Sequence, residues 1–170
     1  MKVRLGTFFT ASYSINNLID FNFGFRFEHI NNLVQKFYRN SRWNDENYEK
    51  DLGPYVIRET LSQKLVKRRL IFNNPSINFG VKSGIIPSHE VSLNFFYTQR
   101  APDIAEMFSD GLHHAIASIE YGNPFLKSEI TKKVVVNFQK KEGDFQYNLN
   151  PYFTTGKNYI VLEPAGVERT

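Results

Sequence analysis

The residues best suited to chemistry are two adjacent histidines, His113 and His114, in a stretch rich in carboxylates. Imidazole nitrogens and carboxylate oxygens are common ligands of divalent metals, so this pair could bind a metal ion. The nearby carboxylates are Asp103, Glu106, Asp110 and Glu120. One pair without a fixed helical or cysteine spacing equally fits loop histidines that are solvated or hydrogen-bonded to backbone. Both interpretations of the histidine pair stay open.

Catalysis finds little support elsewhere in the chain. The sequence contains no cysteine, which excludes a thiolate nucleophile, a disulfide framework and a thiolate metal site. It also lacks a glycine-rich phosphate loop and the strand-to-helix turn that presents a nucleophile. Carboxylates are plentiful, but any two of them can be imagined as a pair. We therefore expect neither an enzyme nor a cofactor.

The composition favours strands whose two faces differ in polarity. The length of 170 residues suggests one domain. The chain contains 16 phenylalanines and 9 tyrosines, and its mean hydropathy is −0.41. A polar average beside so many aromatic residues is typical of β-barrel walls. No apolar run approaches the roughly 18 residues of a membrane helix.

The positive charge does not point to a nucleic-acid partner. The net charge is +4 and the pI is about 9.2, but most basic residues are dispersed along the chain. The single cluster consists of Lys64, Lys67, Arg68 and Arg69. Such a cluster is either a solvated face or, on an outer surface, a contact to anionic lipid headgroups. We expect no nucleic acid to bind.

Alternation with a period of two predicts strands, most clearly at residues 18–29. One face carries Ile19, Phe21, Phe23, Phe25 and Phe27, and the other carries polar residues and glycine. The length is close to the 9–11 residues of a tilted membrane strand, which fits contact with lipid. Burial against a second sheet in a soluble sandwich fits the same alternation.

Further strands and their connections follow an up-and-down pattern. Strands are also predicted at 3–15, 76–82, 91–98, 130–140 and 145–154, and 159–162 is a further apolar piece. The connections are short at 16–17, 85–88 and 141–144, and long at 31–74 and 98–129. Short periplasmic turns that alternate with long external loops are typical of outer-membrane barrels. Inside 31–74, Ile57, Leu61 and Leu65 fit either a short helix or a hairpin that extends the neighbouring strands.

Five short motifs occur in order between Arg100 and Glu129. They are Arg100-Ala101-Pro102, Glu106-Met107-Phe108, Gly111-Leu112-His113-His114-Ala115, Glu120-Tyr121-Gly122-Asn123-Pro124 and Leu126-Lys127-Ser128-Glu129. This series resembles the barrel segment of TonB-dependent outer-membrane receptors, as does Gly24-Phe25-Arg26 within its predicted strand. The resemblance implies an all-β fold. It would be an antiparallel, up-and-down transmembrane barrel segment of about six strands, against roughly 22 in a complete plugged barrel.

The resemblance also implies a function. Such receptors lie in the outer membrane of Gram-negative bacteria and import ferric siderophores, haem, cobalamin, zinc or oligosaccharides. External loops capture the cargo, and the inner-membrane TonB complex then rearranges a plug domain. The loop residues expected to line the ligand vestibule are Arg100, Glu106, His113, His114 and Glu120. Part of the zinc-uptake branch has a similar histidine loop, and Arg100, Glu106, Glu120 and Glu129 are expected to form ion pairs.

Residues 1–170 are expected to form a partial barrel domain. Neither a signal peptide's apolar region nor a plug domain is recognisable before the first strand, and the last residues lack an aromatic-ended final strand. We therefore expect an unclosed barrel whose partners are outer-membrane lipid, the cargo and, through the missing plug, the TonB complex. The alternative is a soluble all-β module that binds glycans or proteins and buries the Phe21–Phe27 face against another sheet.

Overall fold

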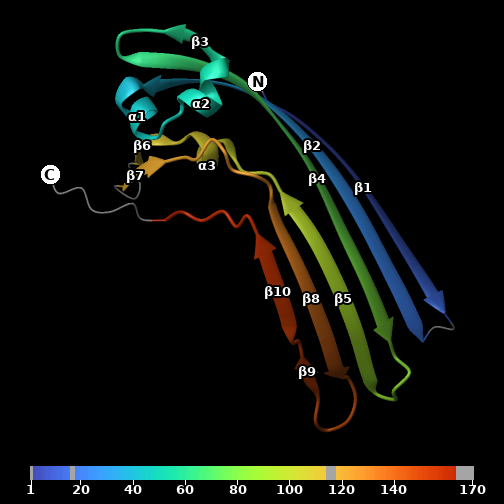
Figure 1. The fold of residues 1–170 in the computed structure, drawn as a ribbon. Helices are drawn as coiled ribbons and strands as arrows, with labels where there is room; N and C mark the ends of the chain where they lie inside the picture. Colours follow the sequence, from blue (N-terminus) through green and yellow to red (C-terminus); the bar gives the residue numbers. More distant parts are fainter. Residues whose placement is uncertain (1, 16–17, 114–117, 164–170) are drawn as a thin grey trace. The chain divides into compact units, whose positions relative to one another are not determined.

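The computed structural model describes residues 2–15, 18–113 and 118–163, and its main feature is one antiparallel sheet (Figure 1). Six strands follow one another in the order β1–β2–β4–β5–β8–β10. Their bounds are β1 Lys2–Ile15, β2 Ile19–Arg39, β4 Gln63–Ser83, β5 His89–Arg100, β8 Glu129–Lys140 and β10 Tyr152–Lys157. Because β1 and β10 are the two ends of this order, the described strands do not close into a barrel. The predicted all-β antiparallel fold is confirmed.

Shorter elements are added to this sheet. Strand β3 (Val56–Glu59) pairs with β4, strand β9 (Tyr147–Leu149) pairs with β8, and β6 (Asp110–His113) and β7 (Ser118–Tyr121) form a separate two-stranded sheet. The helices are α1 (Asn40–Asp45), α2 (Glu49–Leu52), the 3-10 turn η1 (Gly53–Tyr55) and α3 (Ile104–Phe108). None of the described helices is long and apolar enough to cross a membrane. The chain forms two compact units, Met1–Gly6 with Glu28–Asn73 and Thr7–Phe27 with Asn74–Thr170.

In the second unit, the strand register sorts side chains into an apolar and a polar face. Phe79 lies opposite Phe95 on β5, and Phe95 lies opposite Val134 on β8. Residues directly opposite in an antiparallel pair share one face, so these side chains form an apolar row across three strands. Ring contacts between Phe21 and Phe79 at 6.4 Å, and between Phe9 and Phe23 at 6.4 Å, extend the apolar face to β2 and β1.

The opposite face of the second unit carries asparagines and glycines. Asn137 donates side-chain hydrogen bonds to Asn148 Oδ1 at 3.0 Å and to Asn150 Oδ1 at 2.6 Å. Asn94 donates to Ser92 Oγ at 3.3 Å. Gly24 leaves room for the side chain of Asn78, which a Cβ at Gly24 would overlap. This face is therefore polar and hydrogen-bonded, as the interior of a membrane barrel is.

The apolar face is open within the described part of the second unit. Phe23 is 39% exposed and Phe79 is 45% exposed. The soluble alternative requires this face to be buried against another sheet of the same chain, and none of the described strands covers it. Contact of Ile19, Phe21, Phe23, Phe25 and Phe27 with lipid stays a prediction.

The predicted long connection at 31–74 was too long. β2 continues to Arg39 and β4 begins at Gln63, so the connection spans only residues 40–62. The two strands extend into a region where both faces carry polar residues, such as Asn31 and Asn32, so the alternation of hydropathy disappears while the backbone pairing continues. Of the two alternatives inside this segment, the hairpin is correct, because β3 pairs with β4.

The predicted strand at 145–154 is divided. It forms β9 and β10, and the chain between them passes through Asn150 and Pro151. Pro151 has no N–H to donate to a sheet, but its carbonyl oxygen accepts a hydrogen bond from Val136 N at 3.0 Å. The predicted turn at 16–17 lies outside the described residues, and the apolar piece at 159–162 forms no strand.

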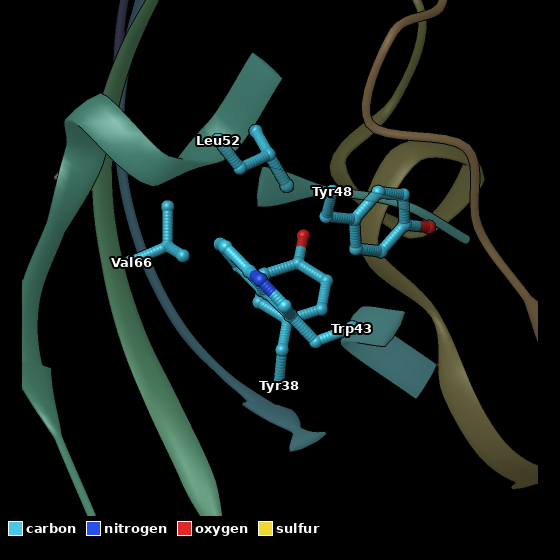
Figure 2. Close-up of a cluster of buried hydrophobic side chains, with 5 residues drawn as sticks. All are labelled: Tyr38, Trp43, Tyr48, Leu52 and Val66. Carbon is cyan, nitrogen blue, oxygen red and sulfur yellow. The ribbon is translucent and has the colours of Figure 1, made fainter. Parts of the chain in front are cut away.

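The first unit has its own small core of aromatic side chains (Figure 2). Tyr38, Trp43 and Tyr48 pack edge to face with ring centroids 5.4–6.0 Å apart, a geometry that favours aromatic pairs. Leu52 and Val66 complete the cluster, and all five side chains are buried. The segment between β2 and β4 therefore folds against these two strands around a small buried core.

A carboxylate anchors this core at its edge. Glu49 accepts a hydrogen bond from Trp43 Nε1 at 2.7 Å and pairs with Lys64 Nζ at 3.0 Å. Lys64 also lies 5.0 Å from the centre of the Trp43 ring. The hydrogen bond from Trp43, followed by that from Lys64, lowers the pKa of Glu49 from its ordinary value of 4.5.

We predict that the apolar face contacts lipid, so that Phe23→Lys destabilises the full-length protein in a lipid bilayer by about 2–4 kcal/mol. The measurement is the urea dependence of folding into lipid vesicles. Asn22→Lys, on the polar face of the same strand, is the control and should cost far less. Equal losses for both variants would refute the assignment of the two faces.

We also predict an acid transition in the aromatic core. Because the folded-state pKa of Glu49 is lowered, its stabilising effect is complete above pH 4.5 and disappears as the pH falls through the lowered value. The fluorescence of Trp43, the single tryptophan of this chain, should follow this loss of stability, with a midpoint below pH 4.5. Glu49→Gln should abolish the transition, and the control Asp51→Asn should retain it. A transition unchanged in Glu49→Gln would contradict the assignment.

Candidate functional site

The candidate site is the segment between β5 and β8, residues 101–128, in the second unit. It contains α3 and the β6–β7 hairpin (Figure 1). Helix α3 begins with a capping box in which the Asp103 N–H donates to Glu106 Oε2 at 2.7 Å and the Asp103 side chain accepts from the backbone of the helix's first turn. The box satisfies backbone donors that a helix N-terminus leaves unpaired, so even this short helix has a defined start.

Arg100 connects the start of this segment to its end. Arg100 and Glu129 lie opposite each other in the β5–β8 register, and Arg100 Nη2 donates to Glu129 Oε2 at 2.9 Å. Its Nη1 donates to Glu106 Oε1 at 3.0 Å, which ties the strand end to α3. The Arg100 side chain is 45% exposed, so each ion pair contributes at most about 1 kcal/mol. The main effect of Arg100 is to fix the relative positions of the two strand ends and α3. The two ion pairs agree with those predicted for Arg100, Glu106 and Glu129.

Gly122 brings the hairpin against the helix. Its N–H donates to Ser109 O at 2.8 Å, and the Asn123 N–H donates to Glu106 O at 3.0 Å. A Cβ at Gly122 would overlap the backbone of Met107 and Phe108. Glycine is thus required by a close approach of two backbones. Gly122 itself does not adopt a positive φ.

The end of the segment is hydrogen-bonded to β4 and to the residue that follows β10. Ser128 Oγ donates to Asn74 Oδ1 on β4 at 2.7 Å, and Asn158 Nδ2 donates to Ser128 O at 3.1 Å. Asn74 is 1% exposed, and Met107 in α3 is 2% exposed. The segment therefore has buried anchors at its helix and at its end.

The predicted site residues are distributed over this segment. Arg100 ends β5, Glu106 lies in α3, and Glu120 lies in β7 opposite Gly111. His113 is the last residue of β6 and pairs with Ser118, whereas His114 lies outside the described residues. No group of three or more histidines, cysteines or carboxylates within the described ranges could hold a metal ion. Metal binding by the histidine pair stays a prediction.

Sequence reasoning missed part of this architecture. The spacing of Asp103 and Glu106 is that of a capping box, and this signal could have predicted α3. The contact between Gly122 and α3, and the hydrogen bond between Asn74 and Ser128, join residues whose approach no local pattern encodes.

These features define a class of protein. An antiparallel up-and-down sheet has one apolar and one polar face, and a structured loop segment joins two of its strands, as in the wall of an outer-membrane barrel. The family model described as TonB dependent receptor-like, beta-barrel matches residues 3–170. The chain belongs to this family, whose members are outer-membrane active transporters and not enzymes. Searches of curated proteins and of solved structures found no match.

We predict that Gly122→Ala displaces the hairpin from α3, because the added methyl group would overlap backbone atoms that have no side-chain freedom. Strain of this kind costs about 1–3 kcal/mol. Limited proteolysis of the intact receptor should show faster cleavage within 104–121. Gly84→Ala is the control, since nothing lies within 4 Å of the Cβ position there. Equal cleavage of Gly122→Ala and wild type would contradict the proposed packing.

Proposed function

We propose that this chain forms part of the wall and the ligand vestibule of an outer-membrane importer in a Gram-negative bacterium. The observation that carries the proposal is the family match over residues 3–170. The two-faced sheet supports it, because an apolar outer face and a hydrated inner face are what a transmembrane barrel needs. The soluble binding module is less well supported, because the apolar face is open among the described residues.

The proposed transport is driven from the inner membrane and involves no covalent chemistry. Residues 1–170 would be a partial barrel domain, and the polar face would line the lumen beside the plug domain that the TonB complex engages. A groove of about 340 Å³ in the second unit is lined by residues that include Gly24, Asn78 and Phe96. The cargo would be scarce and bulky, such as a ferric siderophore, haem, cobalamin, zinc or an oligosaccharide.

Within the vestibule we assign two kinds of role. Arg100 and Glu106 would act as positioning residues, because their charged groups already pair with each other and Arg100 also pairs with Glu129. Glu120, His113 and His114 would be the residues that contact the cargo. If the cargo is zinc, the two imidazoles would supply nitrogen ligands.

The test is uptake by the intact receptor in cells that lack competing receptors. The probes are radiolabelled ferric siderophores, haem, cobalamin, zinc and a maltooligosaccharide, each with and without the proton-motive force. We expect energy-dependent uptake of one probe. His113→Ala/His114→Ala should reduce it at least tenfold for zinc, because metal ligands are lost, and less for other cargo.

Lys127→Ala in the same segment is the matched control and should leave uptake unchanged. A receptor that reaches the outer membrane but takes up none of the probes in an energy-dependent manner would overturn the proposed function. Wild-type zinc uptake by the double histidine variant would overturn only the metal assignment.

A further inference from the structure

The polar face of the second unit carries aromatic rings that the proposed function does not use. Phe96 on β5 shares this face with Asn94 and Thr98, and it is 37% exposed. Tyr152 on β10 lies opposite Val135, which in turn lies opposite Asn94, so the tyrosine stands on the same face. Its side chain is 69% exposed. Both rings interrupt a face that otherwise carries mainly polar side chains and glycines.

Two neighbouring grooves have Phe96 in their common wall. The first, of about 340 Å³, takes three consecutive residues from each of β1, β2, β4 and β5. The second, of about 380 Å³, is lined by Phe96, Thr98, Thr131 and Lys133. Phe96 lies opposite both Asn78 and Lys133, so the shared wall stands on the polar face. Volumes of this size suit a site for a small molecule.

The two grooves are positively charged. Arg26 and Lys133 are among the residues that line them, and none of the described lining residues is an aspartate or a glutamate. The Lys133 ammonium lies 4.8 Å from the centre of the Tyr152 ring, and the ion pairs among the described residues do not involve it. The carboxylates of β5 and β8, Glu90 and Glu129, lie near strand ends and pair with other cations. The grooves therefore attract negative charge and repel a bare divalent metal ion.

The rings and the ammonium group are placed to act on one ligand. Phe96 and Lys133 lie directly opposite each other on adjacent strands, and Tyr152 is on the strand beyond. Neighbouring strands are about 4.8 Å apart, so β5 and β10 lie roughly 10 Å apart on either side of Lys133. Thr98 and Thr131, opposite each other in the next row, add two hydroxyl donors. A flat ring can thus stack on Phe96 while oxygens at its edge reach the ammonium.

Other ligand chemistries use only part of this arrangement. A neutral sugar would use the rings and the hydroxyls but would leave the ammonium without a counter-charge. A small inorganic anion would use the ammonium but leave the rings exposed. A ligand that is both flat and negatively charged uses the rings, the cation and the hydroxyls together.

We propose that the polar face around Phe96 and Lys133 binds a flat, aromatic ligand that carries negative charge, such as an iron chelate formed by catecholate groups. Phe96 stacks on an aryl ring, Lys133 pairs with the charged oxygens, and the two threonine hydroxyls donate hydrogen bonds to them. The inference rests on the proposed function and narrows its cargo. The site is distinct from the candidate segment at residues 101–128.

The experiment measures equilibrium binding of radiolabelled iron chelates to the intact receptor in a neutral detergent. One probe is a hexadentate tris-catecholate, which has aryl rings and is triply negative. The other is a hexadentate tris-hydroxamate, which is neutral and lacks aryl rings. We expect the catecholate to bind about tenfold more tightly or better, because only this probe forms the charged hydrogen bond and the ring stack. An excess of a maltooligosaccharide should not compete.

Variants separate the two contributions. Lys133→Gln should weaken catecholate binding about tenfold, because a hydrogen bond to a charged group is lost. Phe96→Ala should weaken it about fivefold through the lost stacking. The matched controls are Lys132→Gln and Phe95→Ala, which change the adjacent residue on the opposite face of the same strand, and they should alter affinity by less than about twofold. Lys133→Arg keeps the charge and should retain binding.

Salt provides a measurement that needs no variant, because added salt screens the charges and should weaken catecholate binding. Equal affinity for the two chelates, equal losses in the matched controls, or affinity independent of salt would overturn the proposal. Competition by the maltooligosaccharide would replace the flat anion by a neutral sugar as the ligand.

Haem shares the relevant chemistry, since it is flat and carries negatively charged propionates. Tighter binding of haem than of the catecholate, with the same dependence on Lys133 and Phe96, would support the site and identify a porphyrin as its ligand. A receptor that imports zinc or a sugar but binds neither flat anion overturns this inference alone. A receptor without energy-dependent uptake of any probe overturns the proposed function.

Discussion

The hydrogen-bonded register of the antiparallel strands is the constraint on which the rest of the second unit depends. Phe79, Phe95 and Val134 share a face only because they lie opposite one another across β4, β5 and β8. A slip of one residue in any strand would turn its phenylalanines toward the polar face and its asparagines toward the apolar one. The alternation therefore selects one register, and the asparagine hydrogen bonds on the polar face reinforce that choice.

The same register builds the candidate site. It places Arg100 opposite Glu129, so one guanidinium group joins two strand ends and, through Glu106, the helix between them. The ion pairs are partly exposed and individually weak. The backbone contact at Gly122 and the buried Met107 give the segment its packing. Residues 101–128 are therefore held at their start, at α3 and at their end.

The first unit is organised around buried aromatic side chains. Its core is a cluster in which Tyr38, Trp43 and Tyr48 all contact one another, and Glu49 accepts the indole hydrogen bond. Lys64 pairs with Glu49 and Glu59 at the edge of this core, whereas Lys67 and Arg69 on the same strand are exposed.

The sequence by itself determined the fold class, the alternating faces and the six main strands. Apolar and polar residues alternate along each strand, and the strand backbone places successive side chains on opposite faces, so the pattern can be recognised locally. It also indicated the family through the motifs between Arg100 and Glu129, and the family match agrees. Only the tertiary structure decided how far β2 and β4 extend, since polar residues on both faces remove the alternation. It alone decided the role of Gly122 and the division of the basic cluster, because both depend on which residues from distant parts of the chain lie opposite one another.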